Sequence, residues 1–143
     1  LYLPMEINNF PDLHNSKLGT IRTYYIKSKM LNLDFLPERI ESFHTFYLND
    51  LIGNPKRLQK LKDFSFAFED EINQDVIEVL SQLNLESLGI YTKKYSTSLD
   101  EFLKKSNIPS IEIFGLKKDF EIESTLFKRN GITYHLQSKT YYN

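Results

Sequence analysis

The sequence contains no cysteine and no tryptophan among its 143 residues. The absence of cysteine excludes disulfide bonds and thiolate metal sites, and it argues against a small disulfide-bonded secreted scaffold. The chain begins Leu-Tyr-Leu-Pro, with neither an initiator methionine nor the charged start and apolar centre of a signal peptide. We therefore expect a segment of a longer cytoplasmic or nuclear protein that carries no metal and no other cofactor, with Met5 as a true start as the alternative.

A surplus of charge of one sign is also missing. The 18 basic residues oppose 19 acidic ones, for a net charge of -1, so the chain as a whole creates no field that would attract a nucleic-acid backbone. No apolar run approaches the roughly 20 residues that a membrane helix needs. The five glycines form no phosphate-cradling or nucleophile-elbow pattern. These absences predict a protein that is not an enzyme and that binds neither nucleic acid nor a membrane.

Aromatic residues are abundant, with 11 Phe and 9 Tyr, and apolar positions recur at a nearly constant period. The spacing of the segment Leu85-Glu-Ser-Leu88-Gly-Ile90 returns at residues 108–113, at 61–66 and, more loosely, at 40–45 and 18–23. The starts at 18, 40, 61, 85 and 108 are 22, 21, 24 and 23 residues apart. A fixed period of this length indicates a repeat architecture.

Each copy begins with apolar residues at every second position, which predicts a short strand with one buried face. The later copies continue with a helical period, and we expect helices after Asp75, after Ser98 and over residues 119–128. Ser98 and Glu101 have the spacing of a capping box. Asn54-Pro55 predicts another helix start, because proline suits the first helical position. Residues 30–37 predict only an irregular or 3₁₀ turn.

These repeats resemble the leucine-rich-repeat family, in particular its helical-backed branch, which includes ribonuclease inhibitor and F-box/leucine-rich-repeat proteins. The resemblance covers the chain from Leu1 to about Leu136, with partial repeats at both ends. It implies one α/β domain over residues 1–143: a right-handed solenoid with a parallel inner sheet and a mostly helical outer side. Two features depart from the family: Thr23 and Thr45 replace aliphatic residues, and the position of its Asn or Cys ladder holds Ile26, Leu48, Glu69, Lys93 and Leu116.

The resemblance implies a protein-interaction module that binds another protein on its concave face. In the F-box branch, that role is substrate recognition in a ubiquitin-ligase adaptor. Two alternatives are open: a structural scaffold segment of a larger complex, and a non-catalytic part of a larger enzyme. Upstream parts of the same chain are further expected partners.

Outward-facing strand positions supply the candidate binding residues. The position just past the last core residue of each copy gives a nearly continuous aromatic row: Tyr24, Phe46, Ala67, Tyr91, Phe114 and His135. Beside this row, Arg22, His44 and Glu112 are further candidates. Three interpretations are open: the row recognises a partner, it packs against other parts of the parent protein, or a one-residue register error turns it inward.

The remaining polar groups favour ordinary surface roles. His14, His44 and His135 have no second ligand at helical spacing, so they predict no metal site. The acidic residues 69–71 are interpreted as a solvated loop before a helix start. The lysine pairs at 104–105 and 117–118 are interpreted as helix-end and loop charges.

Overall fold

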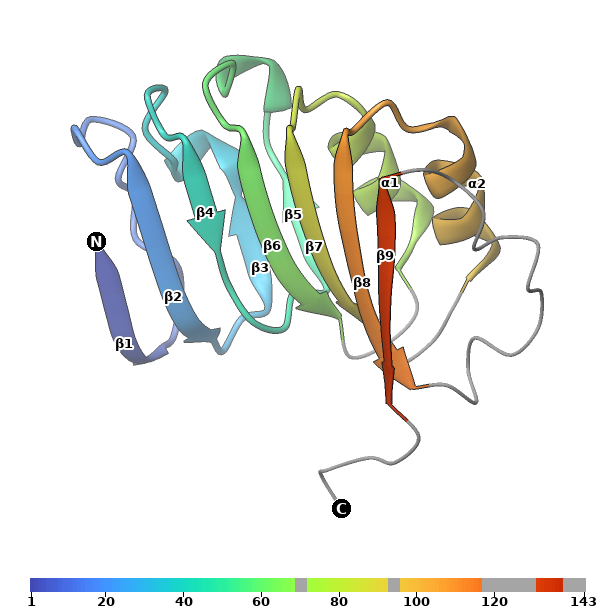
Figure 1. Cartoon of the computed structure of the whole chain (residues 1–143). Helices are drawn as coiled ribbons and strands as arrows, with labels where there is room; N and C mark the ends of the chain where they lie inside the picture. The colour runs from blue at the N-terminus through green and yellow to red at the C-terminus, as the bar shows by residue number, and fades with distance from the viewer. Residues whose placement is uncertain (69–71, 93–95, 117–130, 138–143) are drawn as a thin grey trace.

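The computed structural model describes residues 1–68, 72–92, 96–116 and 131–137; at 3–5, 24, 116, 136 and 137 it describes the backbone only. Seven strands form one parallel sheet in the order β1-β2-β4-β6-β7-β8-β9, so neighbours in the sheet follow one another along the chain (Figure 1). Its strands are β1 (Tyr2–Ile7), β2 (Thr20–Ile26), β4 (Ser42–His44), β6 (Asp63–Phe68), β7 (Ser87–Thr92), β8 (Ser110–Leu116) and β9 (Ile132–Gln137).

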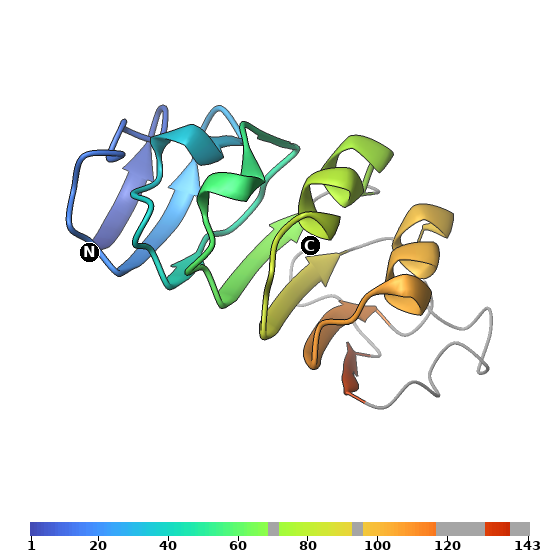
Figure 2. The same ribbon diagram turned by 90° about the horizontal axis from the view of Figure 1, so that it is seen from above.

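The helices and short strands described between these strands form a second layer on one side of the sheet (Figure 2). Behind the first strands, this layer consists of a two-stranded parallel sheet and two 3₁₀ turns. Behind the later strands, it consists of two short α-helices. The elements are β3 (Met30–Asn32), η1 (Leu33–Phe35), β5 (Asp50–Ile52), η2 (Pro55–Arg57), α1 (Gln74–Ser81) and α2 (Thr97–Lys105). Neither helix is long and apolar enough to cross a membrane.

The expected fold class, a right-handed leucine-rich-repeat solenoid with a mostly helical outer side, is wrong. The described residues contain only two α-helices, and no closed solenoid forms. The physical reason is the length of the early connections. Once β5 has taken residues 50–52, only residues 53–62 are left to return the chain to β6, and they accommodate one 3₁₀ turn after Asn54. The helix expected at Pro55 is therefore absent, and the one expected at 119–128 lies outside the described residues.

The two helices that do form begin at other caps than expected. The Asn73 side chain accepts from the Val76 amide at 3.0 Å, so α1 begins one residue before Asp75. The Ser96 hydroxyl accepts from the Leu99 amide at 3.1 Å, in place of the predicted capping box that starts at Ser98. In both cases the side chain that satisfies a free amide lies earlier in the chain than predicted.

Strand register places one residue of each copy at the same level of the core. Pairing connects in turn Ile21, Phe43, Phe64, Leu88 and Ile111, and none of these five side chains is exposed to solvent. The rings of Phe43 and Phe64 stack across neighbouring strands, with centroids 5.8 Å apart. Aromatic and aliphatic side chains from adjacent strands therefore form one continuous core between the two layers.

Two threonines occupy the next inward level, where later copies have Phe66, Ile90 and Ile113. Thr23 and Thr45 are both buried. The Thr45 hydroxyl donates to the Phe46 carbonyl at 3.1 Å, whereas the Thr23 hydroxyl has no hydrogen-bond partner among the residues that the structure describes. A buried hydroxyl without a partner loses its hydration and gains nothing in exchange.

We expect truncation of the shared core to reduce stability strongly. Leu88→Ala and Ile111→Ala each remove a fully buried aliphatic side chain and should lower the free energy of unfolding by about 2–5 kcal/mol, measured by denaturant titration. Glu78→Ala, on the exposed side of α1, is the control and should change it by no more than about 0.5 kcal/mol. Core variants as stable as the control would show that the register is wrong.

The two threonines allow a matched test of hydroxyl burial. Thr23→Val should raise the free energy of unfolding by about 1 kcal/mol, because it replaces an unpartnered buried hydroxyl with a methyl group. Thr45→Val removes a formed hydrogen bond and should lower the same quantity by about 1 kcal/mol. Equal shifts of the same sign in thermal or denaturant unfolding would contradict this explanation.

Candidate functional site

The face of the sheet that points away from the second layer, called here the open face, carries a ladder of stacked rings. Tyr91, Phe114 and His135 occupy paired positions on β7, β8 and β9. The centroids of Tyr91 and Phe114 lie 4.3 Å apart with an interplanar angle of 6°, and those of Phe114 and His135 lie 4.4 Å apart at 12°. Tyr91 is 43% exposed. The ladder is therefore a rigid aromatic surface that faces solvent.

The other residues of the predicted row are placed less regularly. Ala67, on β6, pairs with Tyr91 and is buried. Because alanine has no ring, the stack ends at Tyr91. Phe46 lies beyond the end of β4 and is 43% exposed. Tyr24 is part of β2, and its side chain lies outside the described residues. Glu112 is exposed on β8, and its Oε1 atom lies 3.8 Å from Nε2 of His135, beside the ladder.

His44 is the centre of a hydrogen-bonded cluster on the same face. Its Nε2 atom lies 2.7 Å from the Ser42 hydroxyl and 3.2 Å from Oδ2 of Asp63, and its Nδ1 atom lies 2.5 Å from the Ser65 hydroxyl. The Ser42 hydroxyl also donates to Asp63 Oδ2 at 3.2 Å. Because that hydroxyl gives its proton to Asp63, it accepts from Nε2 of His44, so both ring nitrogens of His44 have hydrogen-bond partners.

The combination of Ser65, His44 and Asp63 contains the residue types of a hydrolase triad. Acyl transfer also requires free donors that stabilise a developing oxyanion. Ser65 lies within β6, which pairs with β4 on one side and β7 on the other. The backbone amides of a strand with two parallel neighbours are engaged in the ladder. The cluster therefore fixes the orientation of the His44 ring, and β6, which carries Ser65, is paired with β4 and β7.

A hollow of about 320 Å³ lies next to this cluster and reaches the ladder. Arg22, His44 and Ser65 contribute polar walls, and Tyr2, Phe46 and Tyr91 contribute aromatic walls. Arg22 pairs with His44 across β2 and β4, and it forms no ion pair with any residue that the structure describes. The structure thus brings four of the predicted residues around one hollow: Arg22, His44, Phe46 and Tyr91. Phe114, His135 and Glu112 do not line this hollow and lie on the next strands of the sheet, β8 and β9.

Sequence reasoning missed Ser42, Asp63 and Ser65. The signal was present in the period: Ser42 and Ser65 lie next to the core residues Phe43 and Phe64 on the outward side, where Ser42 pairs with Asp63 and Ser65 pairs with His44. Short polar side chains at two adjacent outward levels indicate a cross-strand hydrogen-bonded cluster around a histidine.

A metal site needs several His, Asp or Glu side chains close together. No group of three His, Asp or Glu side chains within the described ranges is close enough to hold an ion. His14 is exposed, and its Nδ1 atom lies 2.6 Å from Oδ1 of Asp12. The pKa of Asp12 is lowered, first by this side-chain hydrogen bond, next by the backbone amide of His14, and further by the charges of His14 and Arg57.

Comparison of the chain with protein-family models, with curated proteins and with solved structures found no match. Any function of the chain is therefore inferred from the chemistry and geometry of its own residues.

Proposed function

We propose that the chain is a protein-interaction module that binds its partner through the open face. The observation that carries the proposal is the exposed ladder of Tyr91, Phe114 and His135. Aromatic side chains have few rotatable bonds, so they provide a large contact area at a small entropic cost. Stacking in the free protein already restricts these rings, which lowers the cost of ordering them in a complex.

The polar groups around the hollow support the same proposal. An interface gains specificity from polar groups that are held in place beside its apolar contacts. His44 is held by Ser42 and Ser65, while the guanidinium of Arg22 has no acidic partner among the described residues. Arg22 can therefore pair with a carboxylate of the partner while Tyr91 and Phe46 contact its apolar side chains.

The proposal predicts a separation of binding from folding. Tyr91→Ala and Phe114→Ala should each weaken partner binding by on the order of 2 kcal/mol, or about 30-fold, because central aromatic residues dominate interfaces. The same variants lose only a stacking contact at the surface, so the free energy of unfolding should fall by about 1 kcal/mol. Binding would be measured by pull-down or calorimetry, and folding by thermal melts.

A photo-reactive residue at position 91 would identify the partner used in these measurements, and the same residue at Glu78 on α1 is the control for the opposite side. The proposal requires that crosslinking occurs from position 91 and not from position 78. It also requires that the Tyr91→Ala variant no longer retains, in a pull-down, the protein that crosslinking identified. If the ladder variants fold normally and keep every partner, the open face is not the binding surface. If they melt like Leu88→Ala, the rings belong to the core.

A further inference from the structure

A second surface lies at the edge of the sheet where the strands begin. Because the strands are parallel, the segments that precede β2, β4 and β6 meet at this edge. They enclose a hollow of about 740 Å³. We call it the basic hollow. Its basic residues come from the turn before β4, from η2 and from the turn before β6: Arg39, Lys56, Arg57 and Lys60.

The basic hollow concentrates positive charge in a chain whose net charge is -1. Glu38 is the only carboxylate among the residues that line it. Lys56, Lys60 and Arg39 form no ion pair with any residue that the structure describes. Opposite charges nearby would reduce the local potential, so three cations without such partners favour an anion in this space.

Arg57 is the fixed member of the group. Its Nη1 atom donates to the carbonyl of Leu33 at 3.2 Å and lies 3.8 Å from Oδ1 of Asp34. Its side chain is 23% exposed, so most of it is packed, and Arg57 is one of the residues that line the hollow. The field of Arg57 also reaches Asp12, where it contributes to the lowered pKa. One anchored guanidinium beside three exposed cations is suited to a ligand with several negative groups.

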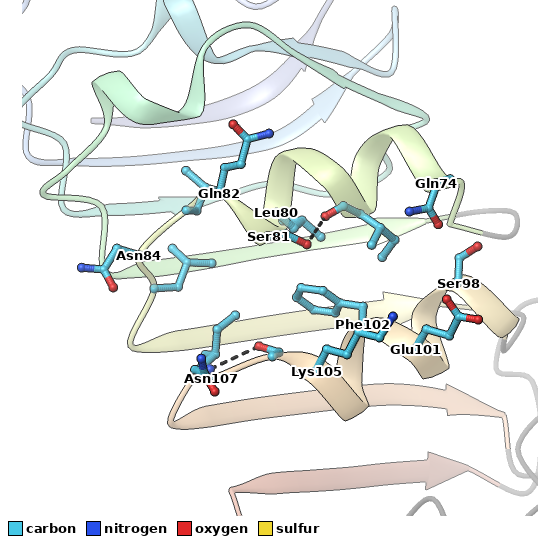
Figure 3. Close-up of a pocket in the computed structure, with 15 residues that line it drawn as sticks. Gln74, Leu80, Ser81, Gln82, Asn84, Ser98, Glu101, Phe102, Lys105 and Asn107 are labelled. Atoms are coloured by element: carbon cyan, nitrogen blue, oxygen red, sulfur yellow. Dashed lines mark hydrogen bonds between the residues drawn. The ribbon is translucent and has the colours of Figure 1, made fainter.

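The same edge farther along the sheet provides an internal comparison. A hollow of about 630 Å³ lies between α1 and α2 (Figure 3). Lys60 directly precedes Leu61 in its repeat, and Asn84 and Asn107 hold the corresponding positions before Leu85 and Ile108. Glu101 and Lys105 supply one charge of each sign to this second hollow. Among the connections that the structure describes, the concentration of positive charge therefore belongs to the early ones and is not shared by those before β7 and β8.

We propose that the basic hollow binds a compact anion with at least two phosphate groups. Guanidinium groups match phosphate oxygens in a forked geometry, and lysine ammonium groups add charge at the rim. The volume lies within the range of small-ligand sites, about 300–1,000 Å³, and is too large for a single phosphate. This surface is separate from the open face, so the inference does not depend on the proposed function.

The test is a calorimetric titration of the whole chain with inorganic tripolyphosphate at constant low ionic strength. We expect saturable binding that Arg39→Gln and Lys60→Gln each weaken about tenfold, since each removes a charge-assisted contact. Glu38→Gln should strengthen binding several-fold, because it removes the carboxylate in the wall. Lys105→Gln, at the other hollow, removes the same charge as Lys60→Gln and should leave the affinity unchanged.

Two outcomes would overturn the proposal: Lys105→Gln weakens binding as much as Lys60→Gln, or Glu38→Gln leaves the affinity unchanged or weakens it. Each would show attraction to net charge without a site. A parallel sedimentation assay with vesicles that contain a phosphatidylinositol bisphosphate distinguishes the source of the phosphates. Vesicle binding that tripolyphosphate displaces supports the site with a lipid headgroup, and tripolyphosphate binding without vesicle binding supports it with a soluble anion.

Discussion

Parallel pairing between consecutive strands is the constraint on which the rest of the structure depends. Every strand runs in the same direction as its predecessor, so the chain must return along the sheet before each new strand begins. Return segments of nearly equal length place residues such as Phe64, Leu88 and Ile111 at one level of the core. Because side chains alternate between faces, the same register also aligns Tyr91, Phe114 and His135 on the open face. Core and ladder thus have a single cause.

The secondary structure of the return segments then determines which residues each half of the molecule exposes. Early returns contain β3 and β5, which leave room only for 3₁₀ turns and bring basic residues such as Arg39 and Lys60 to the edge of the sheet. Later returns contain α1 and α2, whose buried sides cover the core and whose neighbouring turns carry Asn84 and Asn107. A charged edge and an aromatic face therefore lie mainly in different halves of the same sheet.

The sequence predicts the strands better than the layer behind them. A strand needs only a period of two, which short segments around Leu88 and Ile111 display clearly. Helix formation depends on the length available between strands and on caps, and apolar spacing in residues 54–61 could not reveal that β5 had already used part of that connection. Four connections predict helices, of which the structure describes α1 and α2 as helices and the one after Asn54 as a 3₁₀ turn, while residues 119–128 lie outside the described residues.

The candidate site shows the same division. Outward positions could be read from the alternation of apolar residues, so the ladder could be proposed from the sequence. Contacts between side chains on different strands depend on side-chain rotamers as well as on strand register, so the repeat period of the sequence does not predict them. His44, considered alone, looked like an isolated histidine, yet pairing with β6 surrounds it with Ser65 and Asp63.

On the open face, some polar groups already have hydrogen-bond partners and others are exposed to solvent. Under the proposed function, only the second kind can contribute much to the affinity for a partner. Ser42, Asp63 and Ser65 already satisfy His44, so a partner gains little by displacing them. Arg22 and the Tyr91 ring still contact solvent. Burying such groups against matching ones releases water and adds charge-assisted contacts. Under the proposed function, the polar cluster is a fixed support, and affinity comes from the exposed rings and from the Arg22 guanidinium, which has no ion-pair partner among the described residues.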